Sequence, residues 1–144
     1  LYTILRTNVL YGVITKGRLD FVRWVVESLR KGERIRIVTD QINNPTYLDD
    51  LVRAISQVIE FRKFGIYNIG GREFLSRYDF TMRIVDFFKL DGSLVDKIVT
   101  PDLKQPAKRP LNSGLVTLKA ETEFGYSPTQ MEETFRIMQE ELGI

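Results

Sequence analysis

The sequence has no cysteine and no histidine among its 144 residues. The absence of cysteine excludes disulfides, thiolate nucleophiles and Cys-ligated zinc, and it fits a reducing, cytoplasmic location. The absence of histidine excludes imidazole triads and HExxH metal sites. Proton transfer by this chain would therefore depend on Tyr, Lys, Asp or Glu.

Longer patterns are missing as well. No apolar run reaches the roughly 20 residues that span a bilayer, so we expect no membrane partner. No G-x-G-x-x-G turn is present to cradle the phosphates of a dinucleotide. No tyrosine is followed four residues later by lysine, a spacing that would place phenol and ammonium on one helix face. We therefore predict no catalytic residue and no metal ligand here, and an inactive chain if it stands alone.

What remains is an ordinary globular composition, 43% hydrophobic and 28% charged, which predicts a single domain. The formal net charge of +2 is too small to indicate a nucleic-acid partner. Basic residues are concentrated between Lys16 and Arg36, and acidic ones between Glu121 and Glu141. Such clusters are usually solvated faces, and a surface for an anionic ligand is the alternative interpretation.

The chain opens on the apolar run 1–5, which predicts a strand buried on both faces that needs neighbours from elsewhere. We therefore expect residues 1–144 to be a fragment of a larger protein. Apolar periodicity predicts strands over 1–10, 34–39 and 66–69. It also predicts four or five helices, whose apolar faces are Leu19, Val22, Val25, Val26 and Leu29; Leu48, Leu51, Val52, Ile55 and Ile59; Phe80, Ile84, Val85 and Phe88; and Met131, Phe135, Met138 and Leu142.

Helix starts are predicted from capping patterns. Thr46 with Asp49 and Ser76 with Asp79 have the spacing of a capping box, and Ser127 precedes a proline at the first helical position. Ser93 is predicted to cap one further helical turn. The proline-rich stretch 100–112 is predicted to be an extended surface loop, with a short helix over about 115–124 after it.

Three motifs occur in an order typical of one family. They are Arg6-Thr7-x-x-x-Tyr11-Gly12, Val38-x-Asp40-Gln41-x-x-x-Pro45-Thr46, and a tail segment containing Arg109-Pro110 and Ser113-Gly114-Leu115. In these motifs the chain resembles the C-terminal half of dTDP-4-dehydrorhamnose reductase, an extended short-chain dehydrogenase/reductase. The resemblance covers nearly the whole chain. It implies an α/β fold, the C-terminal part of a Rossmann-like fold with few short parallel strands, in which residues 1–144 are the substrate-binding half of an NAD(P)-binding protein.

The resemblance also implies roles for individual residues. Thr7 and Asn8 would contact the carboxamide edge of NADPH or NADH, or the substrate, although a polar strand end that satisfies its own backbone is the alternative. Asn8 stands where the family often has Ser. Gln41 would hydrogen-bond the base, ribose or sugar, and Arg109 would hold the diphosphate through its planar guanidinium. Asn112 would add a neutral hydrogen bond beside it.

Phe21 would stack on the thymine ring, with core packing as the alternative interpretation. The run 70–80 is also similar to a family motif, but its Ser76 and Asp79 are explained by helix capping. The partners expected are a dTDP-linked keto-sugar and, as a possibility, a second copy in a homodimer. Two rival functions stay open: a regulatory protein resembling the beta subunit of methionine adenosyltransferase, and a related nucleotide-sugar epimerase or dehydratase.

Overall fold

The computed structural model describes residues 1–14 and 16–144, and in this part of the chain it shows five α-helices and eight short strands. The strands are β1 (Thr3–Arg6), β2 (Leu10–Tyr11), β3 (Ile35–Val38), β4 (Ile42–Asn43), β5 (Thr46–Tyr47), β6 (Gly65–Asn68), β7 (Leu75–Ser76) and β8 (Val95–Ile98). The helices are α1 (Phe21–Arg30), α2 (Leu48–Glu60), α3 (Arg77–Phe88), α4 (Leu118–Phe124) and α5 (Met131–Leu142), with 3-10 helices η1 (Gly92–Leu94) and η2 (Thr100–Leu103). The predicted α/β class with four or five helices is confirmed.

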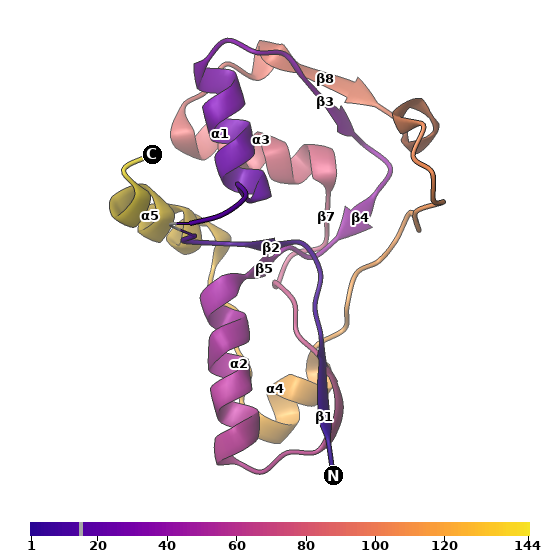
Figure 1. Cartoon of the computed structure of the whole chain (residues 1–144), viewed down its shortest axis with the longest axis vertical. Helices are drawn as coiled ribbons and strands as arrows, with labels where there is room; N and C mark the ends of the chain where they lie inside the picture. Colours follow the sequence, from indigo (N-terminus) through magenta and orange to yellow (C-terminus); the bar gives the residue numbers. More distant parts are fainter. Residues whose placement is uncertain (15) are drawn as a thin grey trace.

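The described strands form pairs rather than one wide sheet. β1 pairs with β6, β2 with β5 and β3 with β8, all parallel, whereas β4 and β7 are antiparallel. A parallel pair needs a crossover connection, and the helices between the paired strands supply it. Figure 1 shows β3 and β8 beside α1 and α3 at one end, β1 near α2 and α4 at the other, and the short strands β2, β5, β4 and β7 between them.

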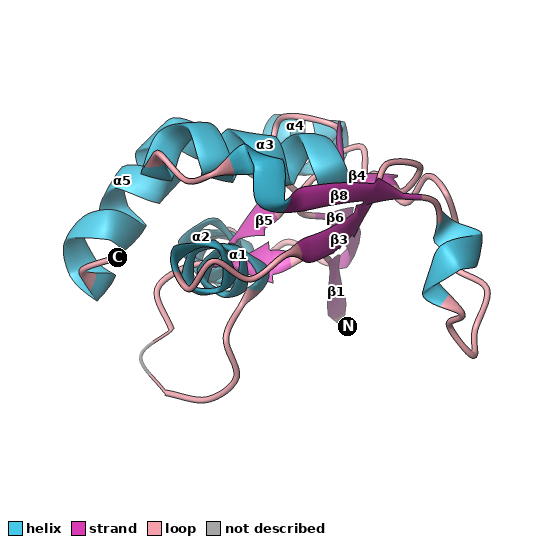
Figure 2. Cartoon of the chain, turned by 90° about the horizontal axis from the view of Figure 1, so that it is seen from above, coloured by secondary structure: helices cyan, strands magenta, loops and turns pink. Residues whose placement is uncertain are grey.

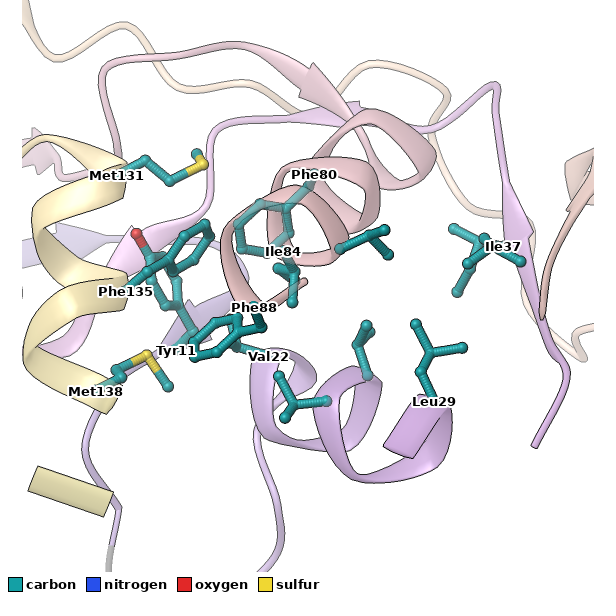
Figure 3. Packing of buried hydrophobic residues seen from close by; sticks show 14 of the residues in the cluster. Tyr11, Val22, Leu29, Ile37, Phe80, Ile84, Phe88, Met131, Phe135 and Met138 are labelled. Atoms are coloured by element: carbon teal, nitrogen blue, oxygen red, sulfur yellow. The ribbon is translucent and has the colours of Figure 1, made fainter. Parts of the chain in front are cut away.

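The larger core lies between α1, α3 and α5, and Figure 3 shows its side chains interleaved. The apolar faces predicted for these three helices are confirmed, because their central residues are buried there. They include Val22, Val25, Val26, Leu29, Phe80, Ile84, Val85, Phe88, Met131, Phe135 and Met138.

The smaller core lies under α2 and α4. It contains Ala54, Val58, Tyr67, Ile69, Ala120, Phe124 and Tyr126. The strand predicted to be buried on both faces by neighbours from elsewhere borders this core, and the burial of its second face stays a prediction. Among the described residues β1 has one neighbour strand, β6, and its side chains alternate, so that Leu5 packs on the core while Ile4 is 46% exposed.

The face predicted for α2 is wrong in part, because Leu51 packs against the smaller core but three other positions do not. Val52, Ile55 and Ile59 are 52%, 43% and 71% exposed, and the helix instead buries Ala54 and Val58. The stripe is apolar as the periodicity indicates, but no described element covers it.

Local capping decides some helix starts and fails to decide others. Ser76 caps α3 by accepting from the amide of Asp79 at 2.9 Å, as predicted. Thr46 is not a cap, because it is buried in β5 and Tyr47 precedes α2 instead. The turn predicted after Ser93 is wrong too, since Asp91 caps η1 and the next residues form β8 against β3.

The C-terminal helices begin later than predicted. α4 starts at Leu118, and α5 starts at Met131 after Gln130, not near Ser127. Stretch 100–112 is largely irregular and exposed, apart from η2. Figure 2 shows that η2 and the loop after it project away from the helices. No described helix has the length and apolar character required to cross a bilayer.

Candidate functional site

A cavity of about 930 Å³ opens beside the larger core. Its walls come from segments far apart in sequence: the turn after β1, the start of α1, the end of β3 with β4, the first residue of α3, and the loop after η2. A cavity of this size suits a molecule as large as a nucleotide. Asn8, Phe21, Gln41 and Arg109, four of the six residues predicted for binding, line it together.

The cavity is strongly cationic. Arg18, Arg36, Arg77 and Arg109 line it, against one carboxylate, Asp20. None of the four arginines makes an ion pair with a described carboxylate. Asp20 is occupied as the N-cap of α1, accepting from the amide of Val22 at 2.8 Å. Grouped cations without counter-ions attract an anionic ligand.

Arg77 is the residue that the sequence interpretation missed. Its guanidinium lies 4.9 Å from the centre of the Phe21 ring. Burial and the positive charge of Arg109 both lower the pKa of Arg77, so the two guanidinium groups act on each other. A signal was present, because a cation in the first turn of a helix is disfavoured by the helix dipole.

Gln41 sits in a polar network at the end of β3. Its Nε2 donates to Thr100 Oγ1 at 3.1 Å, and that hydroxyl donates to Asp40 Oδ1 at 2.8 Å. The bonds from the Thr100 amide and hydroxyl lower the pKa of the Asp40 carboxyl. The network fixes the Gln41 amide and ties the start of η2 to β3.

Arg109 and Asn112 are separated by the structure. Arg109 lines the cavity, whereas Asn112 does not. The Asn112 side-chain oxygen accepts from the amide of Gly114 at 3.2 Å and thus holds the local turn. Its neighbour Ser113 does line the cavity, and its amide donates to Ile42 O at 2.9 Å. Substrate contact by Asn112 stays a prediction.

Thr7 and Asn8 also differ. The Thr7 hydroxyl donates to Thr46 Oγ1 at 3.0 Å and does not line the cavity. Asn8 lines it, donates to Ser113 O at 2.9 Å, and keeps a buried Oδ1 that has no partner among the described residues. Val9 beside it has φ of 35°, a conformation unusual for a β-branched residue and one that costs about 1–3 kcal/mol. Backbone strain is therefore stored at the cavity wall.

Phe21 is in contact with several aromatic groups. Its ring stacks on Phe80 at 5.7 Å between centroids and lies 5.7 Å from Trp24. With Arg77 also over the ring, Phe21 is in protein contact on more than one side. Trp24, 38% exposed, is the more accessible aromatic group at the cavity.

The buried tyrosines have structural roles. The Tyr11 hydroxyl pairs with Thr134 Oγ1 at 2.9 Å, and the Tyr126 hydroxyl donates to Gly70 O at 2.9 Å. Burial raises the pKa of both phenols, away from the range that suits proton transfer near neutral pH. The described residues contain no group of three acidic side chains placed as metal ligands.

The fold defines a class of protein. Parallel strand pairs with helical crossovers give this chain the α/β fold of extended short-chain dehydrogenases, and solved structures of that class share it. A family model described as the RmlD substrate binding domain matches residues 1–143, and the chain belongs to this family.

The relatives agree with this assignment. The chain is 31% identical to the dTDP-4-dehydrorhamnose reductase of Aggregatibacter actinomycetemcomitans, over 92% of this chain and 48% of that protein. A dTDP-4-dehydrorhamnose reductase structure from Clostridium acetobutylicum is similar with a TM-score of 0.87 and 28% identity, over 99% of this chain and 49% of the other. One from Bacillus anthracis, in complex with NADP, has a TM-score of 0.83 and 28% identity, over 96% and 48%. The chain thus spans about half the length of the relatives it matches.

Proposed function

We propose that this chain is the substrate-binding part of an NAD(P)H-dependent reductase that acts on a dTDP-linked 4-keto-6-deoxy sugar. The observation that carries the proposal is the cavity in which Gln41, Arg77 and Arg109 meet without a described counter-ion for either arginine. A nucleoside diphosphate brings the negative charge that this cavity lacks. The named activity of the 31%-identical relative supports the choice of sugar.

Each cavity residue has a place in this scheme. The guanidinium groups of Arg77 and Arg109 would bind the diphosphate with charge-assisted hydrogen bonds. The Gln41 amide, fixed by Thr100, would bind the base, ribose or sugar. These groups bind and orient the substrate, which lowers the entropic part of the barrier without acid-base chemistry.

The residues present also fit a nicotinamide cofactor at one edge. The buried Oδ1 of Asn8 needs a donor, and the amide group of a carboxamide is one. When bound, the nicotinamide supplies the hydride. A Gly-rich phosphate turn is absent from these residues, so we propose that most of the cofactor site lies on another segment.

Two exposed apolar surfaces support the existence of such a segment. The free edge of β1 and the outer stripe of α2, with Ile4, Ile55 and Ile59 exposed, have the character of faces that another part of a sheet covers. We propose that this segment completes the sheet and supplies the proton donor.

Titration of the complete protein with dTDP tests the proposal. Arg109→Ala should weaken binding by about 1–3 kcal/mol, the range for a lost charge-assisted contact. Lys108→Ala is the matched control, because Lys108 is the exposed neighbouring cation and does not line the cavity. An unchanged affinity in Arg109→Ala would contradict the diphosphate role of Arg109.

An activity assay separates the proposal from its rivals. The complete protein should oxidise NADPH or NADH in the presence of the dTDP-linked keto-sugar. Binding of dTDP without reduction would favour a regulatory protein of the kind represented by the methionine adenosyltransferase beta subunit. Conversion of a nucleotide sugar without net oxidation of the cofactor would favour an epimerase or dehydratase.

A further inference from the structure

Asn44 is a fully buried amide at the centre of the site's scaffold, with 0% of its surface exposed. Its Nδ2 donates to Gly71 O at 2.9 Å and to Leu115 O at 3.0 Å. Its Oδ1 accepts from the amide of Leu115 at 2.9 Å and from Asn8 Nδ2 at 3.3 Å. Both donor hydrogens and both acceptor lone pairs of the Asn44 side-chain amide are therefore occupied.

These bonds connect three segments that sequence separates widely. Asn8 belongs to the turn after β1, Gly71 follows β6, and Leu115 lies in the irregular segment that carries Arg109 and leads to α4. The amide is enclosed closely, since a Cβ on Gly70 would lie 2.5 Å from Asn44 Nδ2. A larger side chain would clash here, and a smaller or apolar one would leave the buried groups that bond to Asn44 without partners.

The same junction sets two walls of the cavity against each other. Asn8, held by Asn44, donates to Ser113 O at 2.9 Å, and both residues line the cavity. The segment is aligned with β4 by the amide of Ile42, which donates to Leu111 O at 2.7 Å. Arg109 stands two residues before Leu111, so its path depends on where this segment is fixed.

We infer that Asn44 is a positioning residue that holds the Arg109–Ser113 wall and the Asn8 wall in register, without itself touching the ligand. Asn44 does not line the cavity. Its effect on ligand binding rests on the proposed function, whereas its effect on the 111–115 segment does not.

The test is Asn44→Ala in the complete protein, with three measurements. Without ligand, amide hydrogen exchange at Leu115 should become at least about tenfold faster, because its acceptor is lost. The Kd for dTDP and the KM for the keto-sugar should rise about tenfold, while kcat changes less than about threefold, because the residue acts on placement of the binding wall.

Asn68→Ala is the matched control. Asn68 donates to Val116 O at 3.1 Å, next to the same segment, but it is not buried like Asn44. Its removal should change exchange at Leu115 and the Kd for dTDP less than about twofold. A folded Asn44→Ala protein with wild-type exchange at Leu115 and wild-type KM would overturn the inference.

A second variant covers the case in which Asn44→Ala does not fold. A Cβ on Gly70 would lie 2.5 Å from Asn44 Nδ2, so Gly70→Ala displaces the buried Asn44 amide from its partners while the residue itself is kept. It should reproduce the loss of dTDP affinity, and wild-type affinity there would overturn the inference. If the wild-type protein binds no dTDP, the proposed function fails, and exchange at Leu115 still decides the role of Asn44.

Discussion

At the scale of single residues, Arg77 is the clearest case of a side chain that local structure does not explain. It occupies the first position of α3, where the helix dipole disfavours a cation. Its guanidinium rests on the Phe21 ring and is partly desolvated beside Arg109. The helix dipole, the burial and the charge of Arg109 all disfavour the Arg77 cation, and an anion between the two guanidinium groups would offset them.

Arg77→Met should therefore weaken dTDP binding about tenfold, equivalent to ~1.4 kcal/mol. Methionine keeps an apolar stem of similar length against Phe21, so the free energy of unfolding should stay within about 0.5 kcal/mol of the wild type. Calorimetric titration and urea unfolding of the same samples give both numbers. Arg30→Met, at an exposed position in the last turn of α1, is the control.

Raised salt gives an independent check on Arg77. Screening weakens exposed charge interactions, so dTDP affinity of the wild type should fall as ionic strength rises, and it should fall less steeply in Arg77→Met. Equal slopes and equal affinities in the two proteins would show that Arg77 takes no part in binding.

Sequence could predict some of these residues and not others, for physical reasons. Gln41 and Arg109 lie in motifs that occur in the order typical of one family, and both line the cavity. Arg77 was hidden because the Ser76–Asp79 cap accounts for the neighbouring residues. Asn44 was hidden because an amide in a loop has the same sequence pattern whether it is exposed or buried at a junction of three segments.

At the scale of elements, the start of α1 depends on Asp20. Its carboxylate accepts from the amides of Val22 and Arg23 at 2.8 and 3.3 Å, while its second oxygen is buried without a described partner. Burial raises the pKa of Asp20 above its ordinary value, and the two amide bonds offset only part of that effect. The Asp20 side chain thus stabilises α1 as its N-cap, whereas the burial of its negative charge is unfavourable.

Two substitutions separate the cap from the charge. Asp20→Ala should lower the free energy of unfolding by about 1 kcal/mol, the usual cost of a lost N-cap. Asp20→Asn keeps a capping oxygen without charge and should be at least as stable as the wild type at pH 7.

The pH dependence has a definite sign. Since the folded-state pKa of Asp20 is raised, the folded protein retains the proton longer than the unfolded chain. This group's contribution to stability therefore falls as pH rises from about 4 through the raised pKa. Urea unfolding between pH 4 and 7 should show the difference between Asp20→Asn and wild type growing with pH, and parallel curves would contradict it.

At two element boundaries, the local sequence pattern does not determine the secondary structure. Thr46 has the residue type and spacing of a cap, but its hydroxyl accepts from Thr7, and its backbone pairs in β5 against β2. Residues after Ser93 extend as β8 because β3 offers a parallel partner. In both places, hydrogen bonds to a strand distant in sequence replace the local alternative.

At the scale of the whole molecule, periodicity identifies apolar faces but not what covers them. The predicted stripe of α2 is apolar, yet the smaller core is built on Ala54 and Val58 instead. Ile4 on β1 is exposed for the same reason, because β6 is its one described neighbour strand. Both surfaces agree with the proposed completion of the sheet by another segment.

Ile59→Lys tests that completion, because Ile59 is 71% exposed in this chain. If the other segment covers the stripe, the substitution should lower the free energy of unfolding of the complete protein by about 2 kcal/mol, the value of one buried isoleucine side chain. Glu60 lies about 100° further round α2, on an exposed polar side. Glu60→Lys should therefore change the free energy of unfolding by less than about 0.5 kcal/mol. Thermal and urea unfolding of both variants provide the comparison. An equally small effect of the two substitutions would show that the stripe remains in solvent and that the proposed segment docks elsewhere.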